Sequence, residues 1–272
     1  MRNRILRYLD DPVDHGSFAF TVNYYGNIYK GNLDNLIDWE VYYFGAYAAS
    51  ELCLLYDLIK NKENAIVWDV GANVGNHALF MARYARKVYA FEPYSPVADI
   101  LENRINDNEI NNIELIRVGL GDINDKKSFV PPSKNNLGTG SFINKPETGI
   151  DGNTVSLDIR TGDSVARDLH LDKPDLVKID VEGYEGSVLK GMQDSIHKFR
   201  PAIFMEWSSA TEKDLNVDDL RQLLPEQYKI YQFYDHKPFM FLFNRQGYRL
   251  ELIKDVPREG NILLLPAEWS VF

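Results

Sequence analysis

Short apolar runs alternate with helix-forming segments from residue 65 onward, and this alternation constrains the fold more than any other feature of the sequence. The runs are AIVWDV, KVYAFEP, IELIRVGL, DLVKIDV and AIFMEW, and segments between them predict helices that begin near residues 76, 96 and 184. Strands that alternate with helices form right-handed crossovers and parallel sheets. We therefore predict an α/β protein with a doubly wound, mostly parallel Rossmann-like sheet.

One proline marks the start of a predicted helix and another marks the end of a later one. Ser95 and Pro96 predict an N-cap followed by a first-turn proline, and Pro201 is expected to end a helix just before AIFMEW. The most hydrophobic stretch, residues 41–59, is interrupted by polar side chains. We expect it to form a buried helix rather than a membrane span.

The two flanks of this core have patterns of their own. Residues 17–33 alternate aromatic and polar side chains around Tyr25-Gly26-Asn27, which predicts a hairpin. Residues 131–153 are rich in glycine, proline and asparagine and predict a long mobile loop. We expect residues 1–60 to form an N-terminal hairpin and helix extension packed on a domain of residues 61–272.

Charge and cysteine content limit the classes of partner and compartment. The formal net charge of -10 opposes a phosphate backbone, and we expect no nucleic-acid partner. Cys53 is the single cysteine of the 272 residues, which excludes an internal disulfide and favours a reducing, cytoplasmic location. The first residues lack the apolar region of a secretory signal.

A glycine-containing turn follows the first apolar run. Asp69 ends the run, and Gly71 and Gly75 bracket a turn that leads into a helix near Asn76. Asn73 stands where a dinucleotide-binding turn has its second glycine, and the third glycine is missing. A phosphate-binding Gly-Lys-Ser/Thr sequence is missing as well. The pattern favours a nucleoside ligand without phosphates.

Two further acids end the next runs on the expected rim of the sheet. Glu92 follows Asp69 at roughly the 20-residue interval at which an acid holds ribose hydroxyls. Asp122 follows VGLG and is placed to accept a hydrogen bond from an adenine amine. Each is also explained as a solvated acid at a strand end.

DLVKIDVEG places charges within a run that should be buried. Lys178, Asp180 and Glu182 alternate with apolar residues and are expected on one face of a central strand. Buried ions must neutralise each other or open onto a cleft. Both explanations stay open for this trio.

Four motifs together, DVGANVGNHALFMAR, VYAFEP, VGLGD and DLVKIDVEGYEGSVLKGM, resemble the FkbM-type family of S-adenosylmethionine-dependent methyltransferases. The resemblance covers roughly residues 40–207 and implies a seven-stranded methyltransferase sheet. It implies that the glycine turn contacts the methionine part of S-adenosylmethionine, Glu92 the ribose and Asp122 the adenine. The expected cofactor-binding residues are Asp69, Gly71, Ala72, Asn73, Gly75, Asn76, His77, Glu92, Pro93 and Asp122.

The expected catalytic residues are Asp180, Lys178 and Glu182. Asp180 is the first candidate for a base that removes the proton of an acceptor hydroxyl, and Lys178 would orient it. Glu182 would bind substrate hydroxyls or the amino group of the cofactor. His77 competes as a base, although a capping role explains it equally.

Two other residues and one segment are less specific candidates. His236 and Glu206 each have a substrate-binding and a structural explanation. The histidines suggest no metal cluster, whereas Mg²⁺ bound by Asp180 and Glu206 stays an alternative. We expect no metal. The segment GTGSF, residues 138–142, is a candidate lid.

The sequence thus predicts an O-methyltransferase that acts on a hydroxyl of a small molecule or saccharide. A cofactor-binding regulatory module without turnover and a methyltransferase with a nitrogen acceptor are the alternatives. The second alternative is weaker because DVEGY stands where nucleic-acid N-methyltransferases are expected to carry Asn-Pro-Pro-Tyr. The aromatic N- and C-terminal segments could wall the acceptor pocket or form the interface of a homo-oligomer.

Overall fold

The computed structural model describes residues 16–131, 141–142, 154–235 and 247–269. Its centre is an eight-stranded sheet in the order β13-β12-β14-β11-β10-β3-β4-β5. Five neighbouring strands are parallel: β5 (Ile113–Ile116), β4 (Lys87–Phe91), β3 (Ile66–Val70), β10 (Leu176–Ile179) and β11 (Ala202–Trp207). Three antiparallel strands continue the sheet: β14 (Gly260–Pro266), β12 (Tyr228–Asp235) and β13 (Tyr248–Leu252).

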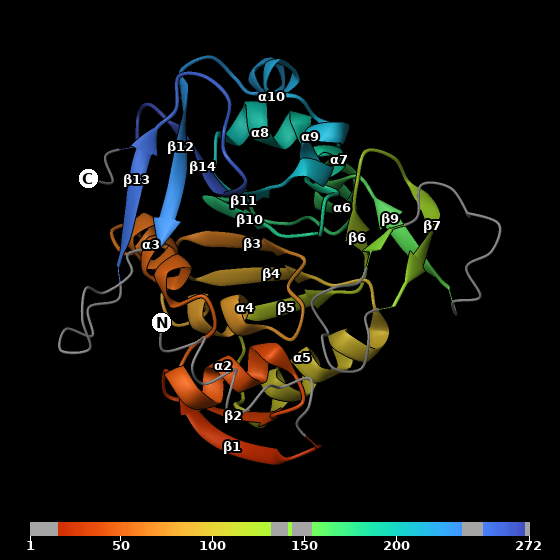
Figure 1. The fold of residues 1–272 in the computed structure, drawn as a ribbon. Helices are drawn as coiled ribbons and strands as arrows, with labels where there is room; N and C mark the ends of the chain where they lie inside the picture. Colours follow the sequence, from red (N-terminus) through yellow and green to blue (C-terminus); the bar gives the residue numbers. More distant parts are fainter. Residues whose placement is uncertain (1–15, 132–140, 143–153, 236–246, 270–272) are drawn as a thin grey trace.

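The predicted α/β fold class is confirmed, and the sheet has eight strands where seven were expected. Helices cover both of its faces (Figure 1). One face carries α3 (Ala49–Ile59), α4 (Asn76–Met81) and α5 (Ser95–Asp107). The other carries α6 (Gly162–Asp168), α7 (Glu185–Lys190), α8 (Gln193–Phe199), α9 (Ser209–Asp214) and α10 (Val217–Leu223).

Strand β3 lies at the centre of the five parallel strands and is covered on both faces, and four of its five side chains are apolar, Asp69 being the exception. All five of its residues are buried. Val67 packs into the core cluster beneath α3 and α4, whereas Trp68 packs into the cluster on the opposite face. A central strand of a doubly wound sheet requires this double burial.

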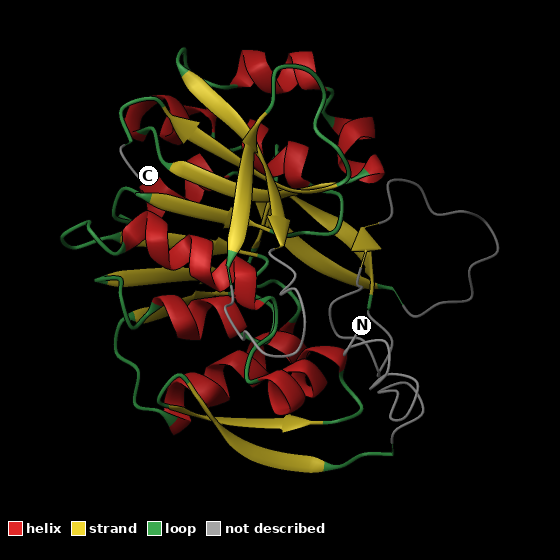
Figure 2. Ribbon diagram, turned by 60° about the vertical axis from the view of Figure 1, so that its left-hand side comes forward, coloured by secondary structure: helices red, strands yellow, loops and turns green. Residues whose placement is uncertain are grey.

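The predicted N-terminal hairpin is confirmed as β1 (Ala19–Tyr24) and β2 (Asn27–Asn32), with Tyr25 and Gly26 at positive φ in the turn. Figure 2 shows the hairpin as a separate layer beyond the helices. It is followed by α2 (Leu36–Phe44). The hydroxyl of Tyr24 donates to the backbone oxygen of Asn76 at 3.1 Å, so this layer contacts the start of α4 directly.

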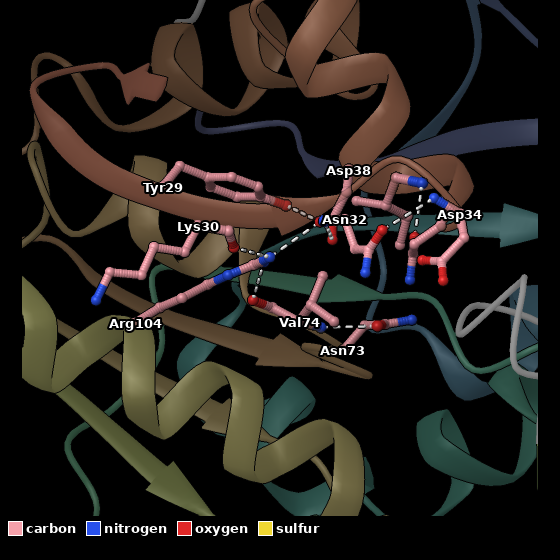
Figure 3. A network of polar contacts seen from close by, with 10 residues as sticks. Tyr29, Lys30, Asn32, Asp34, Asp38, Asn73, Val74 and Arg104 are labelled. Atoms are coloured by element: carbon pink, nitrogen blue, oxygen red, sulfur yellow. Dashed lines mark hydrogen bonds and ion pairs between the residues drawn. The ribbon is translucent and has the colours of Figure 1, made fainter. Parts of the chain in front are cut away.

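A buried arginine joins the hairpin, α2 and the glycine turn (Figure 3). Arg104 of α5 donates to the backbone oxygens of Val74 (2.8 Å) and Lys30 (3.0 Å) and pairs with Asp38 at 2.9 Å. Its guanidinium lies 3.8 Å from the ring centroid of Tyr29, whose hydroxyl donates to Asp38 at 2.7 Å. One side chain therefore ties three separate segments together.

A second, four-stranded sheet corrects one predicted strand. IELIRVGL forms β5 in the central sheet and then β6 (Gly119–Leu120), which pairs instead with β9 (Val155–Arg160). The order of this small sheet is β6-β9-β7-β8, with β7 (Asp125–Val130) and β8 (Ser141–Phe142). The predicted loop of residues 131–153 lies mostly outside the described residues.

Three predicted helix boundaries were wrong. The stretch 41–59 is divided between α2 and α3, because Gly45 caps α2 with φ 79°. The helix expected from residue 184 is divided into α7 and α8 at Gly191 and Met192. Tyr94 rather than Ser95 is the N-cap of α5, because Ser95 already belongs to the helix; the Tyr94 amide donates to Glu92 at 2.9 Å. Among the described residues, no helix is both long and apolar enough to span a membrane.

Candidate functional site

The glycine turn lies where the order of parallel strands reverses. From β3 the chain passes to β4 and β5 on one side, whereas β10 and β11 lie on the other. Ligands of such sheets bind beyond the carboxyl ends of the strands at this switch point. The predicted site residues that follow β3 and β10 therefore meet at one edge.

The turn itself requires glycine at Gly71 and Gly75. Gly71 has φ +75°, and a Cβ there would lie 1.9 Å from the backbone oxygen of Asp180. Gly75 has φ +92°, and a Cβ would lie 2.3 Å from Leu101 Cδ1. The backbone after β3 thus packs directly against the end of β10 and against α5.

Lys178 connects the two strand ends electrostatically. It is 3% exposed, and its ammonium lies 3.4 Å from Asp69 Oδ1 and 3.3 Å from Asp180 Oδ2. It also donates to the backbone oxygen of Gly71 at 3.1 Å. Burial works against its charge, but the carboxylates of Asp180 and Asp69 outweigh burial and hold the pKa of Lys178 above its ordinary value.

Each explanation of the charged run is correct for one of its members, since buried Lys178 is paired internally with Asp69 of β3 and Asp180 opens outward. The side chain of Asp69 is fully buried, whereas that of Asp180 is 44% exposed. The ion network is therefore internal at Asp69 and opens outward at Asp180. Glu182 does not share the strand face as expected, because β10 ends at Ile179 and Glu182 lies in the following turn with φ 54°.

A cavity of about 200 Å³ opens beside this network. It is lined by eight of the predicted site residues: Gly71, Ala72, Asn73, Asn76, His77, Lys178, Asp180 and Glu182. Five predicted residues lie outside its lining: Asp69, Gly75, Glu92, Pro93 and Asp122. The assigned roles of all thirteen remain predictions.

Glu92 and Asp122 have partners within the protein. Glu92 is 8% exposed and accepts hydrogen bonds from the amides of Asn73 (3.1 Å) and Tyr94 (2.9 Å). Burial raises its pKa to about 7 despite these bonds. Asp122 is exposed and accepts a hydrogen bond from the hydroxyl of Tyr184 at 3.3 Å.

The cavity also has residues that sequence reasoning missed as site residues. Glu51 of α3, Asn261 of β14 and Tyr47 line it together with the earlier candidate Glu206 of β11. Asn261 donates to Glu51 Oε1 at 2.8 Å, and Glu51 Oε2 lies 3.3 Å from His77 Nε2. The only signal in the sequence was Glu51, whose carboxylate stands inside the most apolar stretch, residues 41–59. A carboxylate that is buried there needs a partner.

Two glutamates at the cavity have pKa values above the ordinary range. Partial withdrawal from water and the neighbouring carboxylates of Asp180 and Glu206 raise the pKa of Glu182 to about 7, although the residue is exposed at the surface. Burial, then Asp180 and Glu185, raise the pKa of Glu206 to about 7 as well. Both carboxyls can exchange protons near neutral pH.

Asn76 presents buried polar atoms to the cavity. It is 4% exposed, and neither atom of its side-chain amide has a hydrogen-bond partner among the described residues. Unpaired buried amides are costly, so a ligand with hydrogen-bonding groups fits this position.

The Mg²⁺ pair of Asp180 and Glu206 and the lid candidate stay predictions. Within the described ranges, no group of three or more histidine, cysteine, aspartate or glutamate residues is arranged to hold a metal ion. His236 and most of GTGSF lie outside the described residues.

Comparisons with known proteins agree with the motifs. The methyltransferase FkbM domain matches residues 69–250. Hexuronic acid methyltransferase AglP of Haloferax volcanii is 31% identical over 154 residues, which cover 57% of this chain and 61% of AglP. Methyltransferase sdnD of Sordaria araneosa is 28% identical, over 51% of this chain and 64% of sdnD. The match thus spans less than two thirds of either relative.

A solved structure, methyltransferase FkbM from Methylobacillus flagellatus KT, is 19% identical with a TM-score of 0.45 and covers 74% of this chain and 43% of that one. The domain match includes the glycine turn, both acids of the rim and the Lys-Asp-Glu trio. The chain belongs to the methyltransferase FkbM domain family.

Proposed function

We propose that this protein transfers a methyl group from S-adenosylmethionine to a hydroxyl of a small molecule or saccharide. The observation that carries the proposal is the cavity at the switch point, where the glycine turn and the Lys178–Asp180 pair meet. The name of AglP supports a saccharide acceptor. The division into a 1–60 extension and a 61–272 domain, and a cytoplasmic location, belong to the same proposal.

The residues present fit the cofactor. The backbone of Gly71 to Asn73 and the unpaired amide of Asn76 would hold its methionine part, and Glu92 its ribose. When bound, the cofactor supplies a methyl group whose bond to sulfur breaks as the acceptor oxygen attacks, with the electron pair staying on sulfur. Holding acceptor and cofactor together supplies much of the acceleration.

Asp180 is proposed to take the proton of the acceptor hydroxyl. Its carboxylate is the exposed end of the ion network, and Lys178 fixes its direction from 3.3 Å. A positioned base contributes about 10²- to 10⁴-fold. Glu182 would bind hydroxyls of the acceptor or the amino group of the cofactor at the cavity mouth.

The test combines binding and turnover. Asp180→Asn is expected to bind S-adenosylhomocysteine in calorimetry like the wild type, while methyl transfer from labelled S-adenosylmethionine to a panel of glycosides falls about 10²-fold or more. Asp99→Asn, an exposed carboxylate on α5, is the control. Wild-type rates in Asp180→Asn would remove Asp180 as the base. A wild-type protein that binds cofactor without transfer to any acceptor would favour the regulatory module.

A further inference from the structure

The cavity has a polar wall on the side away from the glycine turn. Glu206 on β11 and Asn261 on β14 are register partners, and these strands lie second and third from β3 in the sheet. Glu51 reaches the same wall from α3 and accepts a hydrogen bond from Asn261 at 2.8 Å. None of these three belongs to the turn or to the strand ends expected to hold the cofactor.

A buried histidine faces this wall at ion-pair distance from Glu51 but without a hydrogen bond to its Nε2. His77 is 5% exposed and lines the cavity, and its Nε2 makes no hydrogen bond of good geometry within the described residues, although Glu51 Oε2 is 3.3 Å away. The amide of neighbouring Asn76 is unpaired as well, and the proposed function assigns it to the cofactor, which leaves His77 as the unsatisfied group on the acceptor side. Buried polar groups in this state indicate a ligand that supplies hydrogen bonds.

The charge of the lining is strongly one-sided. Glu51, Asp180, Glu182 and Glu206 contribute carboxyls, whereas Lys178 is the one lysine or arginine of the described lining. Its ammonium already lies between Asp69 and Asp180. An anion would meet like charges at short range in a partly dry cavity, whereas hydroxyls and ammonium groups can donate to the carboxylates.

We propose that Glu51, Glu206 and Asn261 form the acceptor subsite and that it takes a neutral or amino-substituted polyol while rejecting acceptors that carry a carboxylate or phosphate. This inference rests on the proposed methyltransferase function. It extends that function from a hydroxyl acceptor in general to the charge of the acceptor, and it sets this chain apart from AglP, whose name gives a hexuronic acid, a sugar with a carboxylate, as its substrate. Glu206 and Glu51 are specificity-determining residues in this assignment.

The experiment uses three probes that share one ring. Methyl glucoside, methyl glucosaminide and methyl glucuronide are offered to the full chain with saturating S-adenosylmethionine at pH 8. We expect kcat/KM for the glucoside or glucosaminide to exceed that for the glucuronide at least tenfold. Equal or better transfer to the glucuronide overturns the inference, as does transfer to none of the three by a protein that binds S-adenosylhomocysteine. Failure to bind S-adenosylhomocysteine would instead contradict the proposed function itself.

Variants of the polar wall then test whether its glutamates cause the preference for neutral over anionic acceptors. Glu206→Gln should lower the preference for the neutral over the anionic ring about fivefold or more, and Glu51→Gln provides a second variant if the first folds poorly. Glu226→Gln, an exposed glutamate after α10, is the matched control and should keep the wild-type ratio. Unchanged ratios in both wall variants would overturn the assignment.

Discussion

Glu92 has to serve two roles with one carboxylate. It holds the amides of Asn73 and Tyr94, and it is also the proposed acceptor for ribose hydroxyls. We expect Glu92→Gln to weaken the binding of S-adenosylhomocysteine about tenfold, because a charge-assisted acceptor becomes a neutral one. Calorimetry measures the change, with Glu114→Gln on β5, a half-buried residue outside the cavity lining, as the control.

The two roles can be separated with the 2′-deoxy analogue of the ligand. If Glu92 binds the ribose, the analogue should bind the wild type and Glu92→Gln with similar affinity, since the contact is already lost. Equal tenfold losses with both ligands would leave Glu92 only the task of shaping the turn.

Glu206 makes stability depend on pH. Its pKa is raised to about 7, so between about pH 4.3 and 7 the folded protein holds a proton that the unfolded chain has released. Raising the pH through this window therefore lowers the free energy of unfolding, and the loss is complete above about 7. Relative to Glu206→Gln, wild-type stability should fall by on the order of 1 kcal/mol from pH 5 to 8. Urea unfolding at both pH values tests this, and parallel behaviour of the two proteins would contradict it.

Among the secondary-structure elements, α5 holds the hairpin and the glycine turn through Arg104. Removing one partner of a buried ion pair costs about 3 kcal/mol or more. We expect Arg104→Met to lose that much in urea unfolding and to speed hydrogen exchange at residues 71–76. Arg117→Met breaks the exposed pair with Asp99 and should cost less than about 1 kcal/mol. If both variants lost the same free energy of unfolding, the buried pair would contribute no more to stability than the exposed one.

The sequence predicted the parallel strands well, because β3, β10 and β11 are short, apolar and ended by charges or turns. It failed where tertiary pairing decided the outcome. IELIRVGL has one continuous strand pattern, yet its end pairs with β9 in another sheet. The break at Gly45 was missed because the flanking residues are apolar on both sides.

The candidate site was predictable only where its residues follow one another at strand ends. The turn residues and Lys178, Asp180 and Glu182 line the cavity as one group. Asn261 and Glu51 are joined by a hydrogen bond although 210 positions separate them in the sequence, and no local pattern predicts such a contact. The rest of the site depends on how the C-terminal strands add to the sheet.

At the level of the whole molecule, residues 16–60 share a hydrophobic core with the sheet. Tyr24, Trp39 and Leu54 are completely buried in the same cluster as Val67 and Val88. A chain that begins at residue 61 would expose this face to water at roughly 25 cal/mol per Å². We expect it to show no cooperative thermal unfolding by circular dichroism. A sharp transition would mean that the 61–272 domain folds without its extension.

The ammonium of Lys178 contacts both Asp69 and Asp180, so substitutions at these three positions are coupled. A mutation that removed Lys178 would leave the buried carboxylate of Asp69 without its cation, next to the half-exposed carboxylate of Asp180, so the damage would reach β3 as well as the base. We therefore expect a substitution at one of these positions to destabilise the protein unless a second substitution restores the charge pairing. Asp69, Lys178 and Asp180 should be transferred together in any attempt to graft this chemistry onto a different scaffold.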